Sequence, residues 1–146
     1  MLYSRALKMP CLAVAAVICL LSLPGFAREG RDFAGFYSVT QQEEQGDLIT
    51  ITLRVQLFNY SEADISRATV SLHSMLPSSD SYGSFRTVKL WRDKGEVRLM
   101  HQFTLPRWEY ERWQQNSQPQ LFVTYRDDAG TQFERFVQLG SRSVIP

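Results

Sequence analysis

The sequence predicts an all-β protein in which two antiparallel sheets, with about seven strands in total, pack face to face after an N-terminal export signal. Three observations lead to this prediction. Apolar and polar residues alternate with a period of two along most of the chain after residue 32, as in strands with one buried face. Clusters of Gly, Asp, Asn and Ser separate these runs. The first 27 residues instead contain a long uncharged apolar run.

The N-terminal segment is typical of a secretory signal peptide. Arg5 and Lys8 precede Cys11–Leu23, an apolar run of 13 residues, which is shorter than the roughly 20 residues that a membrane-spanning helix needs. Gly25 and Ala27 then place small residues at the positions that signal peptidase recognises. We therefore expect residues 1–27 to be removed after Ala27 and the mature chain to be periplasmic or secreted. The alternative is that the segment is retained as an N-terminal anchor.

Removal of the signal limits the chemistry of the mature chain. Both cysteines, Cys11 and Cys19, lie in the expected signal, so we expect no disulfide, thiolate metal site or cysteine nucleophile. The whole chain has 16 Lys and Arg against 15 Asp and Glu, and only two of these charges fall within residues 1–27. No basic stripe appears, so we expect no nucleic-acid partner. No later stretch is long enough for a membrane span.

The most regular strand is predicted for residues 48–58. Its five alternating apolar residues would be scattered around a helix, but they share one face of a strand. They are Ile49, Ile51, Leu53, Val55 and Leu57. Six more strands are predicted, with turns between them in which Gly supplies positive φ. They cover residues 33–40, 68–73, 88–91, 97–105, 121–125 and 133–139.

Two connections complete the predicted domain, which spans residues 28–140, and a tail follows it. Pro77–Ser84 is expected to be a surface loop, and residues 141–146 a loose tail. Pro106–Pro119 lacks alternation, and Glu109–Gln115 contains good helix formers, so this segment is expected to cross between the sheets with about one helical turn. The strands Phe33–Thr40 and Thr131–Leu139 are the candidate sheet edges at which another chain could add by strand pairing. The alternative is that Lys89, Arg92 and Arg135 protect the edges.

Residues Ile49–Ser61, followed by Ile65 and Ala68–Leu72, resemble bacterial immunoglobulin-like or fibronectin type III-like domains. The resemblance lies in a strand ending Val-x-Leu-x-Asn, a polar turn, and a second strand of the type x-Val-x-Leu. The hairpin of Leu121–Leu139 is also similar to these domains. The resemblance implies an immunoglobulin-like sandwich and a role in adhesion, assembly or spacing outside the cytoplasm. It implies no functional residue, because fold alone does not specify function.

Catalytic and metal-binding patterns do not emerge from the sequence. A hydrolytic triad needs a His beside a nucleophile and an acid. His73 is expected on an outward face, and His101 at the edge of the core. Asp80 and Asp127-Asp128 lie in turns, where Asp is favoured for local hydrogen bonds, and they lack the spacing of a calcium loop. We therefore predict no enzyme, no catalytic residue, no metal and no cofactor.

The candidate interaction surface in the sequence is aromatic. It comprises Trp91, Trp108, Tyr110 and Trp113, which lie outside the clean inward pattern. Three readings stay open: Trp108 and Trp113 cap the open end of the sandwich as core, the rings form a protein interface, or they form a platform for sugar rings. Asn59-Tyr60-Ser61 is in addition a formal N-glycosylation sequon.

These observations together favour a non-catalytic module for protein–protein interaction or structural support in the periplasm or outside the cell. Its expected partner is another envelope or extracellular protein. The alternative is a carbohydrate-binding module that uses Trp108, Tyr110 and Trp113 to bind a glycan.

Overall fold

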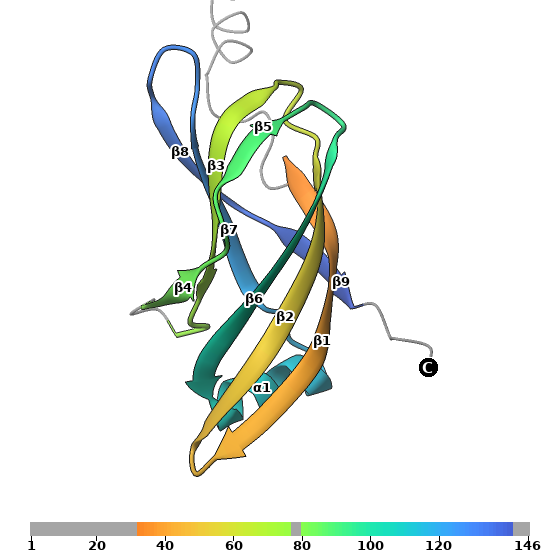
Figure 1. Ribbon diagram of the computed structural model, residues 1–146, viewed down its shortest axis with the longest axis vertical. Coiled ribbons are helices and arrows are strands. Elements are labelled where there is room, and N and C mark those ends of the chain that lie inside the picture. The colour runs from red at the N-terminus through yellow and green to blue at the C-terminus, as the bar shows by residue number, and fades with distance from the viewer. Residues whose placement is uncertain (1–31, 77–79, 142–146) are drawn as a thin grey trace, which may run out of the picture.

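The computed structural model describes residues 32–76 and 80–141 (Figure 1). The expected signal peptide, its two cysteines and residues 142–146 of the expected tail lie outside these ranges. Nine strands and one helix form in the described part. In chain order they are β1 (Phe33–Gln45), β2 (Leu48–Asn59), β3 (Ile65–His73), β4 (Ser81–Ser84), β5 (Val88–Trp91), β6 (Glu96–Pro106), α1 (Arg107–Gln115), β7 (Gln120–Arg126), β8 (Gln132–Phe136) and β9 (Gln138–Ser141).

The predicted two-sheet all-β sandwich is confirmed. Sheet A has the strand order β6-β2-β1-β9. Sheet B has the order β4-β3-β7-β8, with β5 also paired to β3. Helix α1 connects β6 of sheet A to β7 of sheet B, as expected of the crossover, and lies at one end of the sandwich (Figure 1). This helix is too short and too polar to cross a membrane, and it is the one helix of the described residues.

Two differences raise the strand number from about seven to nine. Part of the predicted loop pairs with β3 and becomes β4. The last predicted strand divides at Val137, which is fully buried and donates its backbone N–H to the carbonyl oxygen of Leu121 at 2.9 Å. The chain thereby leaves sheet B as β8 and enters sheet A as β9. A single residue between the two strands carries this change of sheet.

The pairing of β1 differs from the expectation in two ways. Ala34–Tyr37 of β1 pair with β9 in parallel, whereas all the other described pairs are antiparallel. The prediction that Phe33–Thr40 lies at a sheet edge is therefore wrong, because β2 and β9 occupy both of its sides. Thr131–Leu139 does include an edge strand, since β8 is the last strand of sheet B.

The core lies between the sheets and is built by the predicted alternation. All five alternating apolar residues of the long β2 strand are buried. Leu99, Phe103 and Leu105 of β6 and Leu121 and Val123 of β7 are buried as well. Each fully buried aliphatic or aromatic side chain contributes about 1.5–3 kcal/mol relative to an exposed one. The outward residues between them are left to form the two outer faces.

Candidate binding surface

The four predicted aromatics do not form one surface. Trp91 is only 1% exposed, packs against Phe33 with ring centroids 5.1 Å apart, and donates its indole N–H to the carbonyl oxygen of Gly95 at 2.9 Å. The prediction that it lies outside the inward pattern is wrong. The cause is Leu90, whose φ of 51° breaks the alternation, so that Leu90 faces solvent and Trp91 faces the core.

The other three aromatics belong to α1, at the end of the sandwich opposite β5 (Figure 1). Trp113 is 6% exposed and forms part of the core. Tyr110 packs edge-on against Trp113 at 5.9 Å, and its hydroxyl donates to Gln42 Oε1 at 2.9 Å. Trp108, at 39% exposed, is the one indole of the three in the chain that reaches solvent substantially. Trp113 therefore caps the open end of the sandwich as part of the core, whereas Trp108 remains on the surface.

A buried carboxylate holds α1 in place, and sequence reasoning missed it. Glu109 and Trp113 are four residues apart and so share the face of α1 that packs on the sandwich. Glu109 is fully buried and accepts hydrogen bonds from the backbone N–H of Met75, at 2.7 Å, and from the hydroxyl of Tyr82. Burial, and then the bond to Glu109, raise the pKa of Tyr82 to about 12. The sequence marks Glu109 only as a helix former.

The two histidines and the asparagine of the sequon contact neighbouring residues of the fold. Nε2 of His73 lies 2.8 Å from Oγ of Ser71, and the His73 ring packs against Phe122. His101 belongs to the inward row of β6 and lies at the core edge as expected: it is exposed, and its ring centroid is 4.9 Å from that of buried Phe103 and 6.3 Å from that of buried Phe85. Asn59 of the sequon is fully buried, and its Nδ2 donates to the carbonyl oxygen of Ala63 at 2.8 Å. The folded domain therefore does not present this amide for glycosylation. In the described residues, no group of three His, Cys, Asp or Glu side chains could hold a metal.

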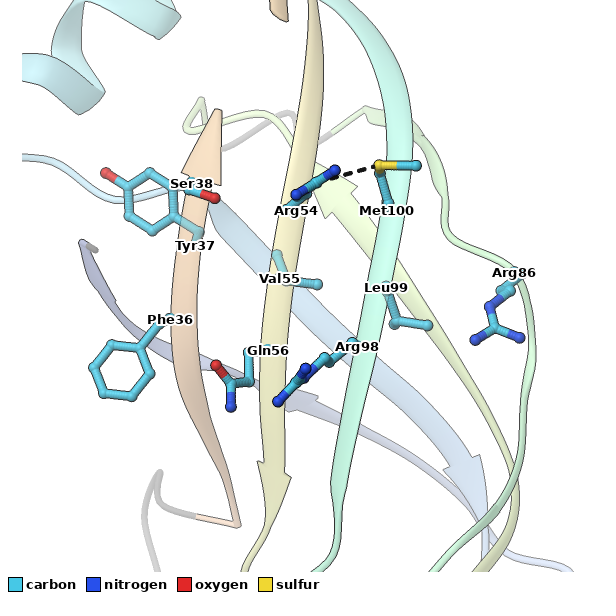
Figure 2. A pocket seen from close by; sticks show the side chains of 10 residues that line it. All are labelled: Phe36, Tyr37, Ser38, Arg54, Val55, Gln56, Arg86, Arg98, Leu99 and Met100. Atoms are coloured by element: carbon cyan, nitrogen blue, oxygen red, sulfur yellow. Dashed lines mark hydrogen bonds between the residues drawn. The ribbon is translucent and has the colours of Figure 1, made fainter. Parts of the chain in front are cut away.

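A different surface emerges on the outer side of sheet A, and we call it the arginine face. It consists of the outward residues Phe36, Ser38, Arg54, Arg98 and Met100, together with Arg86 from the segment between β4 and β5 (Figure 2). The strand register creates it. Phe36 stands opposite Gln56, which stands opposite Arg98. In the next outward row, Ser38, Arg54 and Met100 are neighbours across three strands.

These side chains surround a depression of roughly 580 Å³ above the middle of sheet A. A second depression of roughly 450 Å³ shares Arg54 and Met100 and extends along the strands to Gln41, Thr52 and Gln102. Met100 is 56% exposed and Phe36 is 41% exposed, so large apolar groups lie beside the cations. The two depressions form a shallow track along the strands, with the sheet as its floor.

The charges of the arginine face are largely uncompensated. Arg98 forms an ion pair with Glu96 at 2.6 Å. Arg54 donates only a weak hydrogen bond, to the sulfur of Met100 at 3.4 Å (Figure 2). Neither Arg54 nor Arg86 has a carboxylate partner within residues 32–76 and 80–141. A guanidinium group presents planar donors that match a carboxylate, so this face is chemically suited to acidic groups.

Sequence reasoning missed this surface for a clear reason. Alternation in β2 and β6 already places Arg54 and Arg98 outward. Only the pairing of β1, β2 and β6, together with the path of the segment that carries Arg86, brings the groups onto one face. Strand pairing of this kind is not encoded in the alternation of any single strand.

Comparisons with known proteins give fold-level likenesses only. No protein-family model matches the chain, and no curated protein matches it. A structure of the GH20 exo-β-N-acetylglucosaminidase from Vibrio harveyi with N-acetylglucosamine is similar at 14% identity and a TM-score of 0.42, over 79% of this chain. The likeness covers 19% of the enzyme chain, so this chain spans about a fifth of its length.

Two further structures are similar to the chain. An inactive mutant of the same Vibrio harveyi enzyme has 14% identity and a TM-score of 0.40, over 75% of this chain and 18% of the enzyme chain. The Northeast Structural Genomics Consortium target SoR45 has 8% identity and a TM-score of 0.41, over 77% of this chain and 88% of that one. At these values the likenesses assign neither a family nor a ligand to this chain.

Proposed function

We propose that this chain is an exported, non-catalytic, immunoglobulin-like module that binds another protein of the periplasm or the extracellular space. The observation that carries the proposal is the arginine face. It combines exposed apolar side chains with Arg54 and Arg86, whose charges have no carboxylate partner in the described part of the chain. Arginine and large apolar residues are the types that are enriched at the centres of protein interfaces.

The shape of this surface supports a protein partner over a small ligand. Small-molecule sites enclose most of the ligand surface in a concave pocket. The arginine face lies instead on the outer side of three neighbouring strands of 11 to 13 residues each, β6, β2 and β1. A standard protein interface covers about 800 Å² on each partner. Three long, adjacent strands provide a surface of that kind, with apolar groups and donors distributed along it.

The carbohydrate alternative has less support. A sugar platform on the crossover would need several exposed rings. Trp113 is buried and the hydroxyl of Tyr110 is bonded to Gln42, which leaves Trp108 as the exposed ring of the three. One ring binds a sugar weakly without neighbours to orient it. We therefore favour a protein partner.

Photocrosslinking in the native envelope tests the proposal. The chain offers two matched sites: Phe36 on the arginine face is 41% exposed, and Phe136 on the outer face of sheet B is 38% exposed. Benzoylphenylalanine can replace either residue, because each ring is partly exposed and its added benzoyl group can extend into solvent. We expect one dominant adduct from position 36 and none of that mass from position 136. The same adducts from both positions, or none from position 36, would contradict the proposal.

A further inference from the structure

The edge of sheet A formed by β6 is long and unpaired in the described residues. β6 pairs with β2 in an unbroken register from Leu48↔Pro106 to Phe58↔Glu96. On its other side lie β4 and β5, but both of these strands pair with β3 in sheet B. At about 3.3 Å per residue, the 11 residues of β6 present an edge of roughly 35 Å.

The middle of this edge carries none of the sequence protection that exposed edges usually carry, although Glu96, Arg98 and Pro106 lie towards its ends. Edge strands are normally shielded by charged residues, proline, bulges or a covering segment. Leu99–Leu105 contains no Asp, Glu, Lys, Arg, Pro or Gly, and no bulge interrupts its pairing with β2. His101 is exposed although it belongs to the inward row between buried Leu99 and Phe103. The ring of Phe85, from the segment between β4 and β5, contacts the rings of His101 and Phe103, so this segment lies beside the middle of β6 without pairing with its backbone.

The arginine face adjoins the same edge. Arg98 projects from β6 itself, and Arg54 projects from the next strand, β2. Figure 2 shows Arg86 on the segment at the side of β6 away from β2, and Arg86 lines the same depression. A strand placed beside β6 would therefore point alternate side chains into a region bordered by Arg98 and Arg86. Directly opposed side chains on paired strands lie about 4.5–5.5 Å apart at Cβ.

We propose that an extended segment of a partner protein adds to β6 as a further strand of sheet A, with acidic side chains at alternate positions facing Arg98 and Arg86. The inference rests on the proposed function and specifies the mode of binding and the chemistry of the partner segment. Backbone hydrogen bonds to the free edge supply affinity, as in other cases of strand addition. The guanidinium groups supply charge selection.

Charge favours a foreign acidic segment over a second copy of this chain. Full-length antiparallel pairing of two β6 edges would place Arg98 of each copy opposite Thr104 of the other, so a second copy would bring no acidic side chain opposite Arg98. Each copy would contribute Glu96 as the acidic residue of the strand, and Glu96 already pairs with Arg98. An acidic segment neutralises the face, whereas a second copy leaves its arginines without a further acidic partner.

Synthetic peptides of about ten residues test the inference. The probe alternates Thr with Glu, a second peptide alternates Thr with Lys, and a third is the Glu peptide with N-methyl groups on alternate amides. We expect the Glu peptide to bind the mature protein at least about tenfold more tightly than either other peptide, and to slow hydrogen exchange in β6. Equal binding of the Glu and Lys peptides would overturn the acidic preference. Full binding of the N-methylated peptide would overturn strand addition.

Variants complete the test. Arg86→Glu with Arg98→Glu should reduce binding of the Glu peptide at least about tenfold, because it reverses the charge beside the edge. Arg67→Glu is the matched control, since Arg67 is exposed on β3 of sheet B. A concentration-dependent dimer that is lost in the Arg86→Glu, Arg98→Glu protein would favour a second copy as the occupant and overturn the inference. If a partner is crosslinked from position 36 but the protein shows no preference for the Glu peptide, the proposed function stands. Only strand addition of an acidic segment is then contradicted.

Discussion

The outer face of sheet B and the outer face of sheet A arise from the same kind of alternating strand, but their side chains are partnered differently. On sheet B, Ser71 bonds to His73, His73 packs on Phe122, and Phe122 packs edge-on against Phe136 at 5.7 Å. These groups satisfy one another across three strands. On sheet A, Arg54 has only the weak bond to the sulfur of Met100, and the apolar part of Met100 faces water.

The difference suggests a division of roles between the two faces. A face whose side chains contact one another adds to stability, because cross-strand pairs contribute about 0.2–1 kcal/mol each. A face with uncompensated charges and exposed apolar groups adds little to the folded monomer and keeps its contacts available for a partner. Substitutions should therefore lower stability in the core and on sheet B, and lower binding on sheet A.

The largest loss in the free energy of unfolding is expected from a substitution in the core. Trp91→Ala should lower the free energy of unfolding by about 3–5 kcal/mol, because it removes a buried indole that packs on Phe33 and bonds to Gly95. Urea denaturation of the mature protein measures this. Trp108→Ala is the matched control and should cost within about 0.5 kcal/mol, because Trp108 is partly exposed. Similar losses for the two variants would show that the assignment of inside and outside is wrong.

The next largest loss in the free energy of unfolding is expected on the outer face of sheet B. Phe122→Ala should lower the free energy of unfolding by about 1–2 kcal/mol, because it removes ring contacts to both His73 and Phe136. Met100→Ala on the arginine face should change it by less than about 0.5 kcal/mol. Chemical denaturation of the two variants in parallel compares the faces directly. If Met100→Ala lowered the free energy of unfolding more than Phe122→Ala, the proposed division of roles between the two outer faces would be contradicted.

The hydrogen bond between Tyr82 and Glu109 of α1 should make a pH-dependent contribution of about 1 kcal/mol to the free energy of unfolding, typical of one hydrogen bond. The pKa of Tyr82 is raised to about 12 by burial and by Glu109. Because the neutral phenol is favoured in the folded state, its contribution is complete below pH 10 and is lost as the pH rises from 10 to 12. Tyr82→Phe should abolish this part of the alkaline loss. The pKa of Tyr125 is also raised by burial, so the readout is the difference between wild type and variant.

The predicted role of Tyr82 in the alkaline loss of stability would be contradicted if wild type and Tyr82→Phe lost stability equally between pH 8 and pH 11.5. In that case the phenol would not be the group that holds Glu109. The charge of the arginine face should not change between pH 8 and pH 11.5, because guanidinium groups remain protonated over that range.

The smallest stability effect is expected on the arginine face. Arg54→Glu with Arg98→Glu should change the free energy of unfolding by less than about 0.5 kcal/mol, because both side chains are exposed. Thermal or urea denaturation checks this. A loss of more than about 2 kcal/mol would mean that the face supports the fold and would weaken its assignment to binding.

Local periodicity predicted much of the fold, and its failures have particular physical causes. The alternation in β2, β6 and β7 correctly predicted three strands and most of their buried rows, with His101 of β6 as the exposed exception. Trp91 was misassigned because the positive φ of Leu90 reversed the alternation within β5. The change of sheet at Val137 and the parallel pairing of β9 depend on tertiary contacts, which leave no periodic signal.

The candidate site was harder to predict than the fold. Tryptophan content directed attention to the crossover, where Trp113 proved to be core and Glu109 proved to be the anchor. The arginine face depends on which strands are neighbours. Arg54 and Arg98 are 44 positions apart in sequence, yet they lie on adjacent strands because Arg54 pairs with Met100. Each residue alone is an ordinary exposed arginine.

The most direct test of the account is partner recovery by charge-reversed variants in the native envelope. Tagged full-length chains carrying Arg54→Glu and Arg98→Glu, or Arg67→Glu as the control, are crosslinked in cells, purified and quantified by mass spectrometry. We predict that recovery of the dominant partner falls at least about tenfold with the first protein and is retained with the second. Equal recovery of that partner by both proteins would contradict the central claim that the arginine face is the binding surface.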